Sequence, residues 1–210
     1  IWSLALQSDG SAYIGGEFTN VGGFARGGVA RIAPNGLVDA LFNPGTGATN
    51  PVYAVATESS GTVLVGGAFA TFNGANAPGL IRLTAGGTID ATFNPGTGAN
   101  GPVRAIAVQA NGSIVVAGDF TAINGNAASR IARLNANGAF DASFNPGLGA
   151  DNSIYSLTVQ TDGAIIVSGA FTTFNGITRN GIVRLNVDGS ADASFNTGTG
   201  ANGPVRASAI

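Results

Sequence analysis

The sequence predicts an all-β protein built from one repeated sheet, and three observations support this prediction. The same pattern recurs every 51 residues, tight-turn dipeptides separate short apolar runs, and 34 of the 210 residues are glycine. Hydrophobic residues make up 44% of the chain and charged residues only 10%. This composition allows a buried core, whereas a disordered chain would be poor in apolar residues and rich in charge.

The repeat keeps one period along the whole chain. A glycine, an arginine, an aspartate and a phenylalanine of each unit recur 51 positions apart, the last as Phe18, Phe69, Phe120 and Phe171. Four full units cover residues 1–51, 52–102, 103–153 and 154–204, and residues 205–210 begin a fifth. A fixed period is the signature of a repeat architecture. We therefore treat residues 1–210 as one repeat domain without a linker, and expect it to be a segment of a longer array.

Each unit contains four strand candidates. In the third unit they lie at 103–109, 113–120, 129–135 and 139–145, with an Asn-Gly turn between the first two and another between the last two. Asn-Gly and Asp-Gly between apolar runs favour tight hairpins, because both residues tolerate positive φ. Two hairpins per unit predict one antiparallel four-stranded sheet.

Both faces of this sheet are expected to be covered. Val115 and Val116 are neighbours in a strand and so point to opposite faces, and both positions are apolar in every unit. Sheets covered on both faces by copies of themselves form a radial or stacked array. Four strands in about 50 residues is the size of a β-propeller blade, so we predict a β-propeller of four such blades plus the start of a fifth. A β-solenoid is the alternative, although it needs no tight hairpins.

The unit resembles a known bacterial repeat. "VRAIAVQANGSIVVAGDF" and "RIARLNANGAFDASFNPG" in the third unit are similar to the β-propeller repeat called the delta-sixty repeat, and the resemblance covers essentially the whole chain. It implies a module of a large secreted or surface-attached bacterial protein. Members share no common activity, so the resemblance implies a scaffold and supplies no catalytic residue.

Composition excludes several function classes. The chain has no cysteine, histidine, lysine or methionine, all nine cations are arginines, and the net charge is −2. Zinc sites, thiol chemistry and an activated serine are thereby excluded. No basic stripe indicates a nucleic-acid partner, and no apolar run reaches the roughly 20 residues of a membrane span. We expect no enzyme activity and no cofactor; calcium binding stays open, because oxygen ligands exist without a known loop spacing.

An arginine and an aspartate flank the second predicted hairpin turn of each unit. In the third unit they are Arg133 and Asp141, which a three-residue turn would place opposite each other. A cross-strand pair of opposite charges contributes about 0.2–1 kcal/mol. Because the pair occurs in all four units, we interpret it as structural.

Variation between units is a better guide to a site. The loop between the second and third strands and the loop leading to the next unit emerge at the same end of the sheet, which we call the long-loop face; the two tight turns lie at the opposite end, the tight-turn face. Binding residues concentrate on long loops. The long-loop face carries Arg26, Arg130 and Arg179, together with Glu17, Asp119 and Asp151, the three carboxylates that no repeated position explains.

A second variable position lies at the start of the first strand. It holds Trp2, Tyr53, Arg104, Tyr155 and Arg206 in successive units. Alternating aromatic and arginine side chains could stack a sugar ring or an aryl group; packing between blades is the alternative. The candidate ligand-binding residues are Trp2, Arg26, Tyr53, Asp119, Arg130, Asp151, Tyr155 and Arg179.

These observations favour a non-catalytic scaffold or adhesion module of a bacterial secreted or cell-surface protein. One alternative is a carbohydrate-binding or glycan-hydrolysing propeller that uses the long-loop face. Another is a filament-forming repeat whose blade edges pair between chains. The partners expected are a glycan, another surface protein or further repeats of the same chain. The sequence names no ligand and fixes neither the total blade number nor the oligomeric state.

Two further expectations follow from the repeat. Gly118 closes the second strand, where a side chain is expected to strike the neighbouring blade, and Phe120 is expected in the core. The chain also holds five copies of the first strand but four of every other strand. In a closed four-blade ring, residues 1–6 and 205–210 would compete for one position. We therefore expect residues 205–210 to begin another blade of a longer array or larger propeller.

Overall fold

Each unit forms one antiparallel sheet in the computed structural model, which describes residues 1–209. The first strands are β1 (Ser3–Leu6), β6 (Val52–Thr57), β11 (Val103–Val108) and β16 (Ile154–Val159). The second strands are β2 (Ala12–Gly15), β7 (Val63–Gly67), β12 (Ile114–Gly118) and β17 (Ile165–Gly169). The third strands are β5 (Val29–Ile32), β10 (Leu80–Leu83), β15 (Ile131–Leu134) and β20 (Ile182–Leu185). The predicted all-β fold is confirmed.

The fourth pass of each sheet is shorter than the sequence predicts. It pairs with the third strand through one isolated bridge, such as Leu134 with Phe140. The Asp141 amide still donates to the Arg133 carbonyl at 2.9 Å, but the Asp141 carboxylate then accepts the Ser143 amide at 2.9 Å. This side-chain turn bends the backbone away from the ladder. The same aspartate turn ends the fourth pass in all four blades.

A small hairpin joins the second and third strands, where the sequence predicts only a loop. The four hairpins are β3 (Asn20–Val21) with β4 (Phe24–Ala25), β8 (Thr71–Phe72) with β9 (Ala75–Asn76), β13 (Ala122–Ile123) with β14 (Asn126–Ala127), and β18 (Thr173–Phe174) with β19 (Ile177–Thr178). In the third blade, Asn124 and Gly125 adopt φ of 50° and 73°, as a tight primed turn requires.

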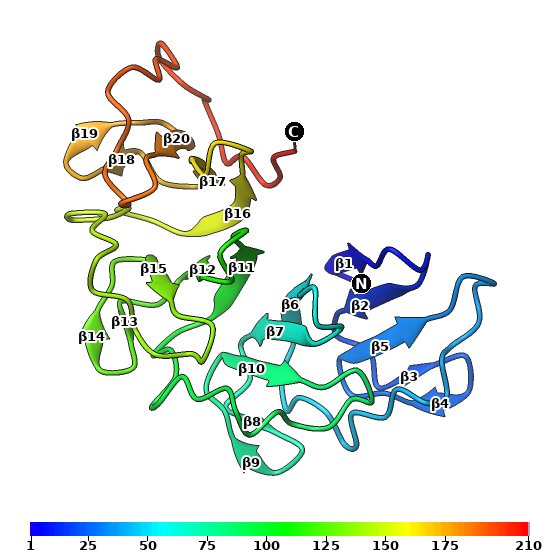
Figure 1. Cartoon of the computed structure of the whole chain (residues 1–210). Coiled ribbons are helices and arrows are strands. Elements are labelled where there is room, and N and C mark those ends of the chain that lie inside the picture. The colour runs from blue at the N-terminus through cyan, green and yellow to red at the C-terminus, as the bar shows by residue number, and fades with distance from the viewer. Residues whose placement is uncertain (210) are drawn as a thin grey trace.

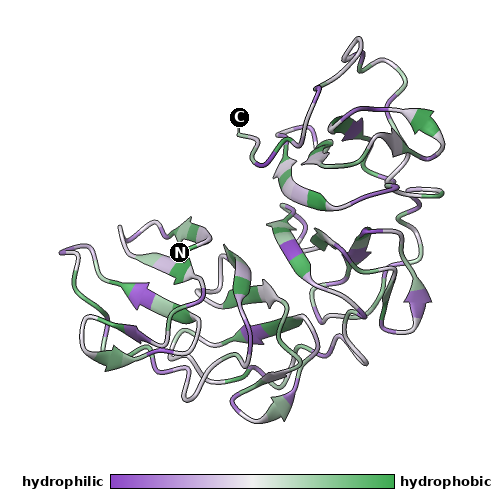
Figure 2. Cartoon of the chain, turned by 180° about the vertical axis from the view of Figure 1, so that it is seen from behind, coloured by the Kyte–Doolittle hydropathy of each residue, from purple (hydrophilic) through white to green (hydrophobic). Residues whose placement is uncertain are grey.

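The blades lie side by side in an arc, with the first strands on the concave side (Figure 1). The apolar core lies between blades: one cluster joins each consecutive pair. Val115 packs toward the fourth blade and Val116 toward the second, as their opposite orientations predict. Apolar residues accordingly recur along the strands of every blade (Figure 2).

Backbone hydrogen bonds also link consecutive blades at the tight-turn face. The Asn94 amide of the second blade donates to the Asn137 carbonyl of the third at 2.8 Å, and Arg82 donates to the Ala136 carbonyl at 2.7 Å. Gly138, at φ 91°, permits this approach, because a Cβ there would lie 2.8 Å from the Asn94 backbone. The repeated Arg–Asp ion pair therefore has two structural roles. It closes a turn within its own blade, and in the second and third units its arginine also donates a hydrogen bond to the next blade.

Residues 205–209 occupy the place of a further first strand beside the fourth blade. The Val205 amide donates to the Gly169 carbonyl at 2.9 Å, as the Val52 amide donates to the Gly16 carbonyl at 3.1 Å at the interface between the first and second blades. Ser208 contacts Ser156 and Thr158 on β16 rather than the first blade. The structure is thus an arc and not a closed four-blade ring, as expected; Ile210 lies outside the described residues. Continuation of the array stays a prediction.

Candidate functional site

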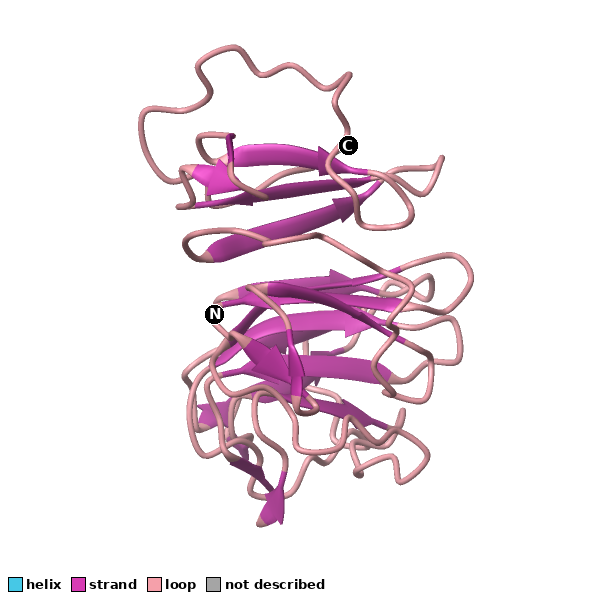
Figure 3. Cartoon of the chain, turned by 90° about the vertical axis from the view of Figure 1, so that its left-hand side faces the viewer, coloured by secondary structure: helices cyan, strands magenta, loops and turns pink. Residues whose placement is uncertain are grey.

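The strands of each blade run between two loop-bearing ends (Figure 3). The variable residues of the first strands lie at the long-loop face, because the start of each first strand pairs with the end of the second strand, where the long loop begins. Each of three blades has an irregularity there. The pairing of β11 with β12 steps from Val103 opposite Gly118 to Ala105 opposite Ala117, which leaves Arg104 as an extra residue. Tyr53 and Tyr155 occupy the same step in their blades. A bulge of this kind redirects the extra side chain, so it determines where these three side chains point.

The glycine opposite the bulge is required by the backbone. A Cβ on Gly118 would lie 2.1 Å from the Pro102 carbonyl oxygen, which accepts a hydrogen bond from the Asp119 amide at 2.9 Å. The expectation that this side chain would strike the neighbouring blade is therefore wrong: the obstacle is the entrance to the first strand of the same blade. The preceding position faces the neighbour instead, since a Cβ on Gly66 would lie 2.8 Å from Val103.

The three redirected side chains and the equivalent residues before and after them form a continuous row across the blades. We call Trp2, Tyr53, Arg104, Tyr155 and Arg206 the aromatic–arginine ladder. Trp2 meets Tyr53 edge to face at 6.3 Å between ring centroids. The Arg104 guanidinium lies 4.9 Å from the Tyr53 ring and 5.6 Å from the Tyr155 ring, and Arg206 lies 5.3 Å from Tyr155. These distances are those of cation–π contacts.

The side chains of the ladder therefore pack against one another between blades. Guanidinium groups from both neighbouring ladder positions lie over the Tyr155 ring, so a sugar would have to displace one to stack there. The geometry matches the packing alternative of the sequence analysis. The ligand-binding role of Trp2, Tyr53 and Tyr155 stays a prediction.

Asp119 is bound to the ladder. One of its carboxylate oxygens accepts from Arg104 at 2.7 Å, and the other is buried without a partner among the described residues. Burial favours the neutral acid, but the hydrogen bond from Arg104 and the charges of Arg104 and Arg130 outweigh it. The pKa of Asp119 therefore lies below its ordinary value. A carboxylate that stays ionised at neutral pH is poorly suited to donate a proton as a general acid.

Asp151 has a structural role that the sequence analysis missed. It takes the position of Asn100 one blade earlier, whose side-chain oxygen accepts the amides of Thr121 and Ala122 at 2.8 and 2.9 Å. The Asp151 carboxylate accepts the Thr172 amide and hydroxyl, at 2.9 and 2.6 Å, and the Thr173 amide at 3.1 Å. The statement that no repeated position explains Asp151 is therefore wrong. The sequence signal that could have revealed this role is the exchange of Asn100 for Asp151 at the same position of successive units.

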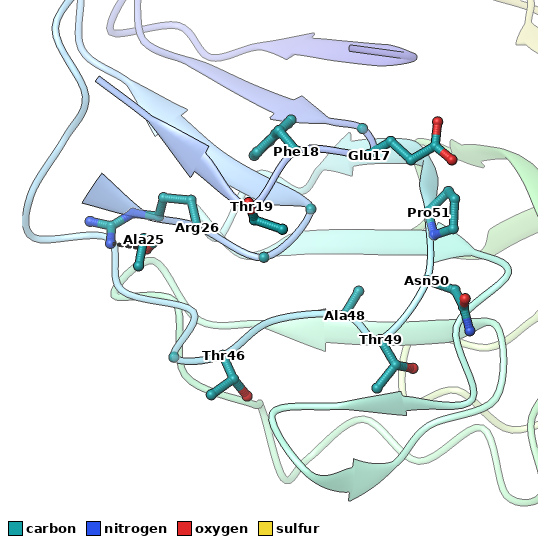
Figure 4. A pocket seen from close by; sticks show the side chains of 14 residues that line it. Glu17, Phe18, Thr19, Ala25, Arg26, Thr46, Ala48, Thr49, Asn50 and Pro51 are labelled. Carbon is teal, nitrogen blue, oxygen red and sulfur yellow. Dashed lines mark hydrogen bonds between the residues drawn. The ribbon is translucent and has the colours of Figure 1, made fainter. Parts of the chain in front are cut away.

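Glu17 and Arg26 line a cleft of about 280 Å³ on the long-loop face of the first blade (Figure 4). Their charged groups point away from one another at opposite ends of this cleft. Arg26 is only 5% exposed; it donates to the Ala25 carbonyl at 2.8 Å, and its guanidinium lies 5.2 Å from the Phe24 ring. A cleft of about 300 Å³ recurs in the second blade with uncharged lining residues. The cleft is therefore a repeated feature of the blades, and the charge of its lining residues differs between the first and second blades.

The described residues were searched for clusters of metal-ligating side chains and for membrane-spanning helices. No three His, Cys, Asp or Glu side chains within 1–209 are grouped as ligands for a metal ion. Over the same residues, no helix is long and apolar enough to cross a bilayer.

The repeated blades, joined by cores between neighbouring sheets, define a β-propeller. The sequence matches the family profile described as a β-propeller domain of unknown function (DUF5122) over residues 7–42, 58–93, 109–144 and 160–195, more than half of the chain. The chain belongs to this family, and the resemblance to the delta-sixty repeat is confirmed. Most of each first strand, including the ladder, lies outside the matched segments.

Among solved structures similar to this chain, a WD40 β-propeller shows the same fold at low sequence identity. The WD40 β-propeller domain of Doa1 is 14% identical, with a TM-score of 0.50, over 90% of this chain and 66% of that domain. A protein of unknown function from Bacteroides caccae is also 14% identical, with a TM-score of 0.39, over 90% of this chain and 79% of that one. The chain thus spans just under two thirds of the Doa1 domain, and this likeness bears on the fold alone. No curated protein matches the sequence.

Proposed function

We propose that this chain is a non-catalytic propeller scaffold of a bacterial secreted or cell-surface protein, and that it presents the long-loop face for adhesion. One observation carries the proposal: apart from Glu17, the carboxylates that could do chemistry already have structural partners. Asp141 and its equivalents pair with an arginine in every blade, Asp119 pairs with Arg104, and Asp151 caps the Thr172 loop. Family membership supports the scaffold and assigns no reaction.

Carbohydrate binding is the second candidate, and the recurring cleft favours it. The cleft lies among long loops, and in the first blade it has a carboxylate and a guanidinium at its ends. Hydrolysis would need two carboxyl groups about 5–10 Å apart around one sugar bond. Of the three carboxylates on the long-loop face, Asp119 and Asp151 already have structural partners, and Glu17 and Asp119 belong to blades that are not adjacent.

Screening against a glycan array, combined with hydrolysis assays on the same glycans, tests this function. We expect binding without turnover, and we expect Asp119→Asn and Asp151→Asn to leave the absence of turnover unchanged. Turnover by the wild-type protein that either substitution abolishes would refute the non-catalytic proposal.

Assembly with further blades is supported by the uncovered face of the first blade. Ile1 and Leu4 are 77% and 58% exposed, whereas Val52 and Val55, the same positions in the second blade, are 0% and 6% exposed. Another blade of the same kind fits this face. A further repeat of the same chain is the occupant we propose, and a second copy in a filament is the alternative.

A further inference from the structure

The charged residues are sorted between the two ends of the blades. The arginines outside the repeated Arg–Asp pairs are Arg26, Arg104, Arg130, Arg179 and Arg206, and all five lie on the long-loop face with Glu17, Asp119 and Asp151. Five arginines and three carboxylates give this face a charge of +2. The tight-turn face has the other four arginines and eight carboxylates, a charge of −4, and the two values account for the net charge of −2.

The positive charge is concentrated on the third and fourth blades and on the adjoining residues 205–209. Glu17 offsets Arg26 on the first blade, and Asp119 offsets Arg104 on the third. Asp151 directs its carboxylate at the Thr172 loop. Among residues 1–209, no ion pair is made by Arg130, Arg179 or Arg206. Three arginines without a carboxylate partner therefore follow one another along this half of the face.

Arg130 adopts a backbone conformation that residues other than glycine disfavour. Its φ is 70°, in the left-handed region, and the other three blades have glycine at this position, with φ between 73° and 79°. The guanidinium donates to the carbonyls of Asp151 and Asp119, at 3.2 and 3.4 Å, and carbonyls do not neutralise its charge. A non-glycine residue retained in such a conformation is a recurrent feature of functional sites.

The chemistry of this surface fits a ligand with many carboxylates. A guanidinium binds a carboxylate through two parallel hydrogen bonds, a geometry that favours arginine over lysine. Each contact at a partly exposed site is weak, so useful affinity requires one ligand that engages several arginines at once. Exposed amides of Asn152 and Asn202, in the loops that enter the next first strands, can donate to and accept from hydroxyl groups between these charges. A folded protein partner would instead bury an apolar centre.

We propose that the long-loop face of the third and fourth blades and of the adjoining residues 205–209 binds a linear acidic polysaccharide through Arg130, Arg179 and Arg206. This inference rests on the proposed function as a binding scaffold and specifies its ligand class. The carboxylates of successive sugar residues pair with the arginines, while the sugar hydroxyls contact the neighbouring amides.

Binding of the whole chain to immobilised polygalacturonate tests the inference, with uncharged dextran as the reference polymer. We expect binding to polygalacturonate only, and a marked loss when NaCl is raised from about 0.1 to 1 M, which shortens the screening length from about 10 to 3 Å. Arg130→Gly and Arg179→Ala introduce residues that other blades already have, at Gly79 and Ala77. Each is expected to weaken binding about three- to tenfold.

Asp162→Asn is the matched control, because it also changes the charge by one unit, with the opposite sign and on the tight-turn face. Asn111 already fills this position in the third blade and accepts the same turn hydrogen bond. The control is expected to keep wild-type affinity, and equal melting temperatures would show that all variants are folded.

Four results would overturn the inference: no polygalacturonate binding, salt-independent binding, unchanged affinity of both arginine variants, or equal binding to polyglutamate, which would indicate an acidic peptide instead. Binding to neutral glycans alone would refute the inference and leave the proposed scaffold intact. Turnover of polygalacturonate would refute the non-catalytic function while supporting the ligand class.

Discussion

Gly118→Val is expected to destabilise the protein by about 3 kcal/mol or more. The new Cβ would lie 2.1 Å from the Pro102 oxygen, a backbone atom that no rotamer change can move. Relieving the overlap would open the bulge, break the hydrogen bond from the Asp119 amide to Pro102 and shift Arg104 out of the ladder. Thermal unfolding followed by circular dichroism measures the effect.

Asp119→Ala is the matched comparison, because it changes the adjacent residue. Two other blades already have alanine there, Ala68 and Ala170, so the backbone tolerates it. Its cost is the pair with Arg104, whose partners are about a quarter to a third exposed, and we expect about 1 kcal/mol. Equal melting temperatures for Gly118→Val and Asp119→Ala would show that the bulge does not need glycine.

Phe120→Ala is expected to lower the free energy of unfolding by about 3–5 kcal/mol. Phe120 is fully buried in the core between the second and third blades, and its removal leaves a cavity lined by both sheets. Because the core joins neighbouring blades, the substitution should also loosen their contact. Urea unfolding gives the free energy, and limited proteolysis between the two blades reports the loosening.

Phe24→Ala provides the control for the loss of an aromatic ring. Phe24 is 40% exposed on the small hairpin of the first blade, where it contacts Arg26. We expect it to cost about 1 kcal/mol or less. If Phe120→Ala cost no more than Phe24→Ala, the core would not lie between the blades.

The architecture could be predicted because the same pattern of apolar and turn residues recurs in all four units. Val115 and Val116 are both apolar, so both faces of the sheet must be buried, and only neighbouring copies can cover them. The tight turns were predictable because Asn-Gly has few other uses between apolar runs. The shortened fourth pass was not, because the side-chain turn at Asp141 depends on where Ser143 lies in space.

The candidate site was predicted less completely, because the direction of its side chains also depends on the three-dimensional structure. Variation between units located the long-loop face and the ladder position, but side-chain direction there depends on a bulge whose register no residue type reveals. The capping role of Asp151 required knowing what Asn100 does one blade earlier. The unusual backbone of Arg130 was visible only as an arginine among glycines, which sequence alone does not distinguish from an ordinary surface exchange.

The residues proposed to bind the ligand are not needed for the propeller fold. A variant in which they are replaced by the residues of another blade tests this most directly. Glu17→Ala, Arg26→Ala, Arg130→Gly and Arg179→Ala together give each position the residue of the second blade, at Ala68, Ala77 and Gly79. Polygalacturonate affinity and melting temperature are then measured on the same protein. We expect a cooperative unfolding transition within a few degrees of the wild type and loss of detectable binding. Unfolding of the variant, or wild-type affinity in a folded variant, would contradict the claim.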